Sequence, residues 1–174
     1  ADIVKIYRQI RINKSDYNYQ RILWRPNSNQ PIQEFQLLTV TYDISPAVFI
    51  ATHTLNQLAY DEGHNHPLAA QILLNDFYVD DCISGSDTLQ QTVLSYKQLN
   101  SLLWSAGFEL RKWASNSQDL LSIIPEEHKV IFETLSFDNP FTQAIQTLCL
   151  LWNICSDSFT IQFKRFKIRH LPNA

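Results

Sequence analysis

Two adjacent carboxylates, Asp80 and Asp81, lie in the stretch of the chain whose residue types most suggest chemistry, residues 77–84. Most of the surrounding residues are apolar or aromatic, which predicts a hairpin whose turn holds both aspartates. Two like charges side by side in an apolar hairpin are unfavourable unless a cation neutralises them. Hard divalent cations prefer oxygen ligands, so one interpretation is a cation site. The alternative is a solvated turn, because Asp is common in turns.

The elements that must position this hairpin follow from periodicity and capping residues. The pattern predicts these segments in chain order: strands at 19–25 and 33–42, helices at 46–61 and 67–74, the hairpin at 77–84, a helix at 88–106, a strand at 108–113, a helix at 117–124, and strands at 145–153 and 158–163. The helix at 88–106 is the clearest, with Asp87 as its expected cap and Gly107 at its end. This order predicts an α+β fold, an antiparallel sheet with helices packed on one face.

The composition supports a globular domain and excludes several classes of protein. The 174 residues are 45% hydrophobic and 18% charged, enough for a core. No apolar stretch approaches the ~20 residues that span a bilayer, so no membrane partner is expected. The start of the chain does not resemble a signal peptide, and three sparse cysteines indicate an intracellular rather than a secreted protein. The net charge of −3 carries no overall signature of nucleic-acid binding.

Several segments resemble reverse transcriptases, in the order in which that family carries them. Tyr78–Asp81 resembles the YxDD motif, and Asp2–Ile10 resembles the first carboxylate motif. Ser45–Phe49 resembles the template-contacting segment, and Gly107–Asn116 resembles the lysine-bearing motif. Leu148–Asn153 is similar to the LGLxWN stretch of the Pao/Bel group of retrotransposon polymerases. The chain therefore resembles a Pao/Bel-type reverse transcriptase.

The resemblance implies a fold, a domain division and a reaction. Residues 1–160 would form a truncated reverse-transcriptase palm with partial fingers, and residues 161–174 would be a basic tail of separate origin. The implied activity is RNA-directed DNA polymerisation, a two-metal nucleotidyl transfer with an RNA or DNA template-primer and dNTPs as partners. The other parts of the polyprotein, namely the rest of the fingers, the thumb, the RNase H and the integrase, would be missing.

The resemblance also implies which residues hold the metal. Asp2, Asp80 and Asp81 would be the catalytic carboxylates and would bind two Mg²⁺ ions, or Mn²⁺. The backbone carbonyl of Ile3 would be a further ligand. Because Asp2 and Asp80 are 78 positions apart in sequence, only the fold can bring them together.

Three further residues would contact the substrate. Tyr7 would lie under the incoming sugar and exclude a 2′-hydroxyl by its shape, the alternative being an ordinary half-buried core aromatic. Lys112 would lie near the triphosphate as a proton donor, the alternative being a solvated lysine at a strand end. Tyr78 of the YxDD motif would also contact the substrate.

The chain departs from the family pattern in ways that bear on activity. Asp43 and Cys149 stand where the family has Gly, and Asp43 would add a negative charge beside the phosphates. Asp2 is the second residue, so we expect its strand to fray. Without the fingers and the thumb, we expect this chain by itself not to polymerise.

Two other functions are weighed against the polymerase. The main alternative is a catalytically inactive retroelement remnant, either inert or acting as an RNA- or protein-binding module. An unrelated Asp-dependent phosphohydrolase would need a second acidic or histidine cluster near Asp80, and the sequence does not provide one.

The four tryptophans are expected in the core rather than as base-stacking surfaces: Trp24, Trp104, Trp113 and Trp152.

Overall fold

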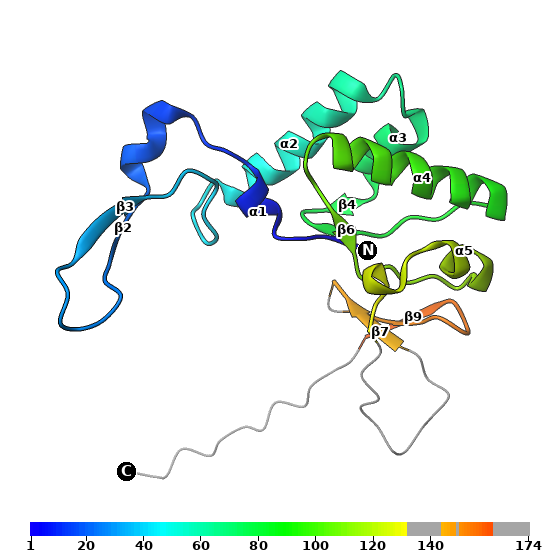
Figure 1. The fold of residues 1–174 in the computed structure, drawn as a ribbon. Helices are drawn as coiled ribbons and strands as arrows, with labels where there is room; N and C mark the ends of the chain where they lie inside the picture. Colours follow the sequence, from blue (N-terminus) through cyan, green and yellow to red (C-terminus); the bar gives the residue numbers. More distant parts are fainter. Residues whose placement is uncertain (132–143, 149, 162–174) are drawn as a thin grey trace, which may run out of the picture. The chain divides into compact units, whose positions relative to one another are not determined.

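The computed structural model describes residues 1–131, 144–148 and 150–161, and the chain divides into two compact units, Ala1–Val130 and Ile131–Ala174 (Figure 1). The elements of the first unit are β1 (Asp2–Ile3), α1 (Ile6–Gln9), the 3₁₀ helix η1 (Lys14–Tyr19), β2 (Arg21–Trp24), β3 (Gln33–Gln36), α2 (Ala47–Glu62), α3 (Pro67–Asn75), β4 (Phe77–Tyr78), β5 (Asp81–Cys82), α4 (Leu89–Ser105), β6 (Leu110–Arg111), α5 (Gln118–Ile123) and the 3₁₀ helix η2 (Glu126–His128). The mixture of helices with antiparallel sheets is the α+β class expected from the sequence.

A four-stranded antiparallel sheet in the order β4-β5-β1-β6 is the centre of the first unit. Side chains alternate between the two faces of a strand, and directly paired residues share a face. Ile3 pairs with Leu110, and both are almost completely buried, at 1% and 2% exposure. The side chains of this face belong to one core cluster with residues of α2, α3 and α4, among them Leu55 of α2 and Leu73 of α3. The opposite face is therefore left for polar residues.

The three long helices form where the sequence predicted them, but their caps differ. The side chain of Thr88, not Asp87, accepts a hydrogen bond at 3.3 Å from the amide of Gln91 and caps α4. Gly107 follows α4 with φ of +82°, a left-handed conformation that favours Gly after a helix. Pro46 occupies the N-cap position of α2 without a side-chain hydrogen bond to the helix.

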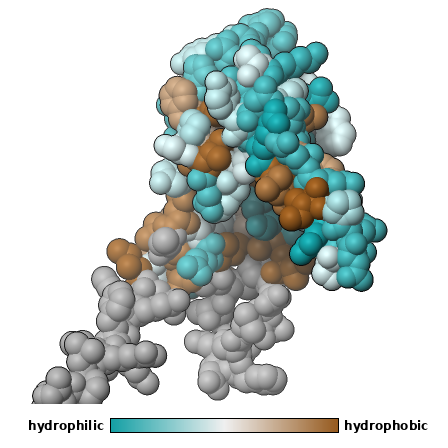
Figure 2. Space-filling view, turned by 90° about the vertical axis from the view of Figure 1, so that its left-hand side faces the viewer, coloured by the Kyte–Doolittle hydropathy of each residue, from teal (hydrophilic) through white to brown (hydrophobic). Residues whose placement is uncertain are grey.

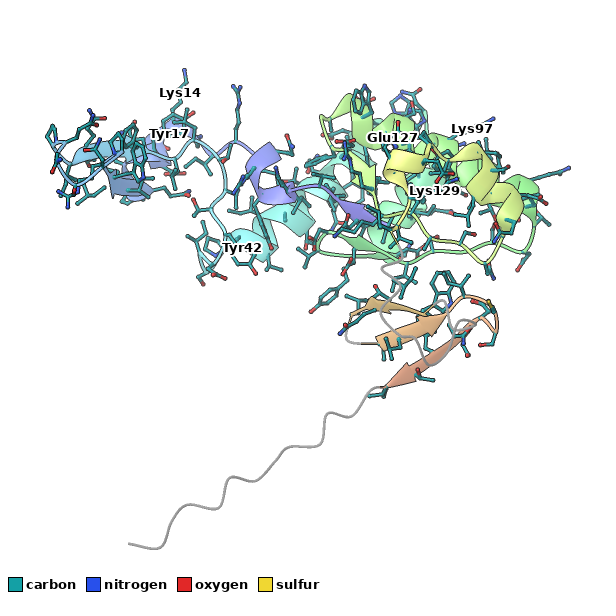
Figure 3. The ribbon with its side chains drawn as sticks, turned by 60° about the horizontal axis from the view of Figure 1, so that its bottom comes forward. Lys14, Tyr17, Tyr42, Lys97, Glu127 and Lys129 are labelled. Carbon is teal, nitrogen blue, oxygen red and sulfur yellow. The ribbon has the colours of Figure 1, made fainter. Side chains whose placement is uncertain are left out.

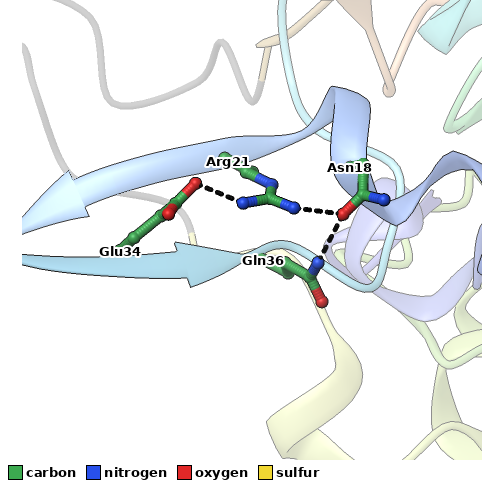
Figure 4. Close-up of polar contacts among 4 residues, drawn as sticks. All are labelled: Asn18, Arg21, Glu34 and Gln36. Carbon is green, nitrogen blue, oxygen red and sulfur yellow. Dashed lines mark hydrogen bonds and ion pairs between the residues drawn. The ribbon is translucent and has the colours of Figure 1, made fainter.

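The β2–β3 hairpin projects from the rest of the first unit, and all eight residues of its strands are exposed (Figure 1). One face of the hairpin holds a polar network (Figure 4): Arg21 donates to Glu34 at 2.6 Å and also to Asn18, and Gln36 donates to Asn18 at 2.8 Å. The network joins both strands to η1. It fixes the base of the hairpin without a buried core beneath it.

The second unit contains a three-stranded antiparallel sheet of β7 (Ala144–Thr147), β8 (Leu150–Asn153) and β9 (Ser158–Ile161). The single strand expected at 145–153 is wrong, because a turn at Leu148, with φ of +46°, divides it into two paired strands. Cys149 and residues 162–174, which include all but the first residue of the expected tail, lie outside the described residues. Among the helices of the described ranges, none has the length and apolarity needed to cross a membrane.

The expectation that the tryptophans are buried is wrong for two of them. Trp24 on β2 is 53% exposed and Trp104 on α4 is 72% exposed. Figure 2 views the molecule from the side of the β2–β3 hairpin and shows hydrophobic patches separated by hydrophilic surface. Aromatic groups are therefore available at the surface of the first unit.

The contact between α2 and α3 depends on Gly63, and it generates a test of the fold. A Cβ at this position would lie 2.1 Å from the Ala59 carbonyl oxygen and 2.7 Å from the Ala70 Cβ. We expect Gly63→Ala to lower the free energy of unfolding by about 2–3 kcal/mol, because the two helices must separate. Gly85→Ala is the matched control, since a Cβ there would meet nothing within 4 Å. Urea unfolding measures both, and equal midpoints would contradict this packing.

Candidate active site

The candidate site is assembled by β1, which lies between β5 and β6 in the sheet. Asp2 pairs with Asp81 on one side and with Arg111 on the other. The Ile3 amide donates a hydrogen bond of 2.9 Å to the carbonyl of Asp80. The segment that resembles the first carboxylate motif is thus hydrogen-bonded directly to the Asp80–Asp81 hairpin. The expectation of fraying assumed a strand without partners, whereas β1 has a partner strand on each side.

Four site residues follow one another across the polar face of the sheet. Tyr78 pairs with Asp81, Asp81 with Asp2, and Asp2 with Arg111, so the four side chains share a face. Tyr78 is the most exposed of the predicted residues in this row, at 67%. Asp80 lies in the turn between β4 and β5 together with Val79. The sequence placed both aspartates in the turn, but Asp81 belongs to β5.

Lys112 supplies a positive charge next to Asp2. Its ammonium group donates a hydrogen bond to the Asp2 carboxylate and forms an ion pair with it. The Asp2 side chain is 18% exposed, and that of Lys112 is 68% exposed. The hydrogen bond to Asp2, with the nearby charges of Asp81 and Asp80, raises the pKa of Lys112, so the amine keeps its proton. The structure thus places the Lys112 ammonium group against the Asp2 carboxylate, with the charges of Asp80 and Asp81 nearby.

The carboxylates also act on one another. Burial, followed by the negative charges of Asp80 and Asp2, raises the pKa of Asp81 above its ordinary value, and the positive charges of the N-terminal amine and of Lys112 oppose this rise. Because the pKa of Asp81 rises, desolvation and repulsion together exceed the attraction of the N-terminal amine and of Lys112 for its carboxylate. A site with these properties gains stability from any additional positive charge that it can accept.

Tyr7 reaches this site from α1. It is half-buried, and its ring lies edge-on to the ring of Tyr42 with 5.8 Å between centroids. Burial raises the pKa of the Tyr7 hydroxyl first, and the charge of Asp80 and the groups at Tyr42 and Asp43 add to the rise. Tyr7 is therefore close enough to the hairpin to feel Asp80. Sequence reasoning missed Tyr42, since no local signal links it to a residue 35 positions earlier.

The donor atoms of the site suit a hard divalent cation. Asp2, Asp80 and Asp81 supply only carboxylate oxygens, which such cations prefer over nitrogen and sulfur. Within the described part of the chain, however, no three side chains of His, Cys, Asp or Glu form a ready-made metal cluster. The Asp2 oxygen that faces Lys112 is already engaged. A cation at these residues would therefore share Asp2 with Lys112 or displace it.

Cys82, the neighbour of Asp81, faces away from this chemistry. It is buried on the core side of the sheet, and burial raises the pKa of its thiol to about 12. The thiol stays protonated at neutral pH, and only the thiolate is a strong nucleophile. We conclude that Cys82 is a core residue.

Three residues of the site have left-handed backbone conformations that side chains rarely adopt. Asp43 has φ of +64°, Val79 of +60° and Lys112 of +53°. The conformation of Val79 is the most unusual, because a β-branched residue is strained at positive φ. Such strain persists only where the surrounding structure imposes it, and it is concentrated at functional sites. Asp43 is also the position where the resemblance led us to expect Gly, which adopts positive φ without strain.

Comparison with protein-family models and with curated protein sequences identifies no relative. The chain matches no family model, and no curated protein sequence matches it. The functional assignment below therefore depends on the motifs and on the geometry of this site.

Asp43 provides a test of the backbone strain at the site. Asp43→Gly and Asp43→Ala both remove the charge, but only Gly adopts φ of +64° freely. We expect the Gly variant to be more stable than the Ala variant by about 1 kcal/mol. Urea unfolding of the pair measures the difference. If the Ala variant is as stable as the Gly variant, Asp43 does not hold this conformation in solution.

The raised pKa of Asp81 predicts how stability depends on pH. The folded state binds this proton more tightly than the unfolded chain, so stability falls as the pH rises from the ordinary carboxyl range through the raised pKa. We expect Asp81→Asn to raise the thermal midpoint at pH 7, and the gain to shrink toward about pH 4. Asp87→Asn, at an exposed position before α4, is the control. A gain independent of pH would show that charge repulsion is not its cause.

Proposed function

We propose that the chain contains the palm of an RNA-directed DNA polymerase of the Pao/Bel retrotransposon type. The observation that carries the proposal is the pairing of β1 with β5, which joins Asp2 to the Asp80–Asp81 hairpin. Nucleotidyl transfer needs carboxylates from separate motifs on one surface, and a solvated aspartate turn would need no such partner. The core face behind them keeps these side chains directed outward.

In this proposal Asp2, Asp80 and Asp81 hold divalent cations, with Mg²⁺ or Mn²⁺ as the candidates. Bound cations would neutralise the triphosphate and lower the pKa of the primer 3′-hydroxyl. Lys112 holds a proton at Nζ beside the same carboxylates. This suits a residue that balances the negative charge of a phosphate or donates a proton to it. The ion pair with Asp2 means that Lys112 must change partner to reach a phosphate.

Tyr7 is the proposed sugar-selecting residue. Its ring is held from one side by Tyr42, and its burial limits the positions that it can adopt. A rigid ring beside the carboxylates would exclude a 2′-hydroxyl by its shape. Tyr78, exposed on the same face as Asp2, is proposed to contact the primer or the nucleotide.

Cation binding to the 174-residue chain tests the proposal. We expect millimolar Mn²⁺ to raise the thermal midpoint of the chain, because it relieves repulsion among the carboxylates. Asp80→Asn should abolish most of this shift, whereas Asp87→Asn should leave it intact. A shift of the same size in both variants would place the cation elsewhere and contradict the proposal.

Nucleotide binding under the same conditions separates a polymerase from other cation sites. A fluorescent dNTP should bind only with Mn²⁺ present and should not bind to Asp80→Asn. Tyr7→Val should bring rNTP affinity closer to dNTP affinity, because it removes the ring that excludes the 2′-hydroxyl. If Mn²⁺ binds and nucleotides do not, the inactive-remnant alternative is favoured. Primer extension that Asp80→Asn abolishes would overturn only the expectation that this chain cannot polymerise by itself.

A further inference from the structure

Two basic residues are placed where they could bind the Asp2 carboxylate. Arg111 pairs directly with Asp2 across β1 and β6, and Lys112 is the next residue along the chain. The Cβ atoms of directly paired residues are about 4.5–5.5 Å apart, within reach of a long side chain. The Asp2 carboxylate nevertheless forms its ion pair with Lys112, and Arg111 binds Glu109. The fold therefore selects the lysine, although the arginine is the cross-strand partner.

The choice between arginine and lysine affects how freely Asp2 can exchange its partner. A guanidinium group binds both oxygens of a carboxylate through two parallel hydrogen bonds, whereas an ammonium group is a point charge on a flexible stem. The Asp2 side chain is 18% exposed, so an arginine bound there would be shielded from water and hard to remove. Lys112 contacts Oδ2 of Asp2 and is 68% exposed, so its side chain can withdraw into water. Lys112 is thus the more exchangeable partner.

Glu109 holds Arg111 in its present position. Arg111 Nε donates a hydrogen bond of 2.8 Å to Glu109 Oε1. The two residues are two positions apart, so their side chains share the polar face of the sheet. His128 of η2 approaches the same oxygen, with 3.5 Å between its Nε2 and Glu109 Oε1. The Glu109 carboxylate thus contacts one basic residue from β6 and one from η2.

Backbone hydrogen bonds fix the position of Glu109 from two directions. The Val4 amide donates to the Glu109 carbonyl at 2.9 Å, which ties Glu109 to the residue that follows β1. The Trp113 amide donates to the His128 carbonyl at 2.9 Å, and the Val130 amide donates to the Trp113 carbonyl at 3.0 Å. These bonds hold the end of η2 against the chain that follows β6. The contact of Glu109 with Arg111 is therefore set by the fold.

We propose that Glu109 is a positioning residue, which holds Arg111 away from Asp2 and so leaves Asp2 to Lys112, a partner that a divalent cation can displace. That a cation binds at Asp2 rests on the proposed function. The selection of Lys112 over Arg111 does not, because it concerns only residues of this chain. An ordinary surface ion pair between Glu109 and Arg111 would leave the partner of Asp2 unchanged when it is removed.

The first test determines which residue binds Asp2 when Glu109 is neutralised, with EDTA present so that no divalent cation takes part. Mass spectrometry measures the rate at which a succinimidyl ester acetylates Lys112, because an amine in an ion pair reacts more slowly than a free one. The exposed Lys97 on α4 (Figure 3) is the internal reference. Glu109→Gln should raise the Lys112 rate at least about threefold, since Arg111 takes Asp2 and releases the lysine.

A second substitution separates this exchange from a loss of structure. Adding Arg111→Met to Glu109→Gln should return the Lys112 rate to the wild-type value, because no arginine is left to take Asp2. Damage to β6 would not be repaired by removing a second side chain. An unchanged rate in Glu109→Gln, or a rise that Arg111→Met does not reverse, would overturn the proposal.

Two further variants are controls for the same rate. Glu127 and Lys129 lie in the segment of η2 (Figure 3), and Lys129 forms an ion pair with Glu126. Glu126→Gln removes this pair without touching Asp2 and should leave the Lys112 rate unchanged. Asp2→Asn should give the fastest rate, because it removes the partner itself. No effect of Asp2→Asn would show that the ion pair does not form in solution, and the proposal would be wrong.

Cation affinity measures the consequence for the site. The electron paramagnetic resonance signal of free Mn²⁺ gives the affinity of each variant in about 0.3 M KCl, where salt screens the long-range effect of a removed charge. Glu109→Gln should weaken Mn²⁺ binding at least about fivefold, and adding Arg111→Met should restore the affinity to within about twofold of wild type. Arg111→Met alone should change it by less than about twofold, because Glu109 already holds the arginine off Asp2.

The outcomes distinguish this proposal from the proposed function. Opposite and additive effects of Glu109→Gln and Arg111→Met on Mn²⁺ affinity would indicate net charge alone and would contradict a positioning role. Equal Mn²⁺ affinity in wild type and Glu109→Gln would also contradict it, and would leave the cation site of the polymerase proposal intact. If neither chain binds Mn²⁺, the polymerase proposal loses its cation site, and the Lys112 rates in EDTA still decide whether Glu109 keeps Arg111 from Asp2.

Discussion

The burial of Ile3 is the constraint on which the rest of the first unit depends. β1 has only two residues, and alternation places Ile3 on the core face and Asp2 on the opposite face. Burying an isoleucine side chain stabilises the fold by about 1.5–3 kcal/mol. A register slip of one residue would expose Ile3 and place Asp2 in the core, which is prohibitive for an unpaired carboxylate. The packing of one apolar side chain therefore fixes where the first carboxylate points.

The site that this register creates is not arranged for stability. Asp2 and Asp81 face each other across neighbouring strands, and the raised pKa of Asp81 reflects this crowding. Lys112 offsets part of the repulsion, but it does so from a backbone conformation that lysine rarely adopts. Val79 adds strain in the turn that carries Asp80. Local features that conflict with stability are most common at functional sites, which supports a chemical role for this face.

Charge segregation gives the first unit two kinds of surface. The carboxylate face suits cations and the groups that cations bind, whereas residues 1–32, with six Lys or Arg and two Asp, suit anions. The net charge averages the two and conceals both. A polymerase needs each of them, because it must bind a nucleic acid strand and also assemble cations at the reacting phosphate.

The sequence by itself determined the local elements. The helices α2, α3 and α4 and the hairpin around Asp80 could be predicted, because periodicity, Pro67 and Gly107 are local signals. The resemblance supplied the list of candidate site residues. The expected cap of α4 was wrong: Thr88 rather than Asp87 caps this helix, since cap geometry depends on how the preceding loop enters the helix.

Only the tertiary structure decided which of those residues meet. Asp2 reaches Asp81 and Lys112 across about eighty and one hundred and ten positions of sequence, and no local pattern encodes such pairs. No local pattern encodes the contact of Tyr7 with Tyr42 either. The exposure of Trp24 was likewise decided by the fold, because no other described element packs over the β2–β3 hairpin. Strand pairing and burial are properties of the assembled sheet. They follow from which apolar faces cover one another, and this is settled only when the whole unit folds.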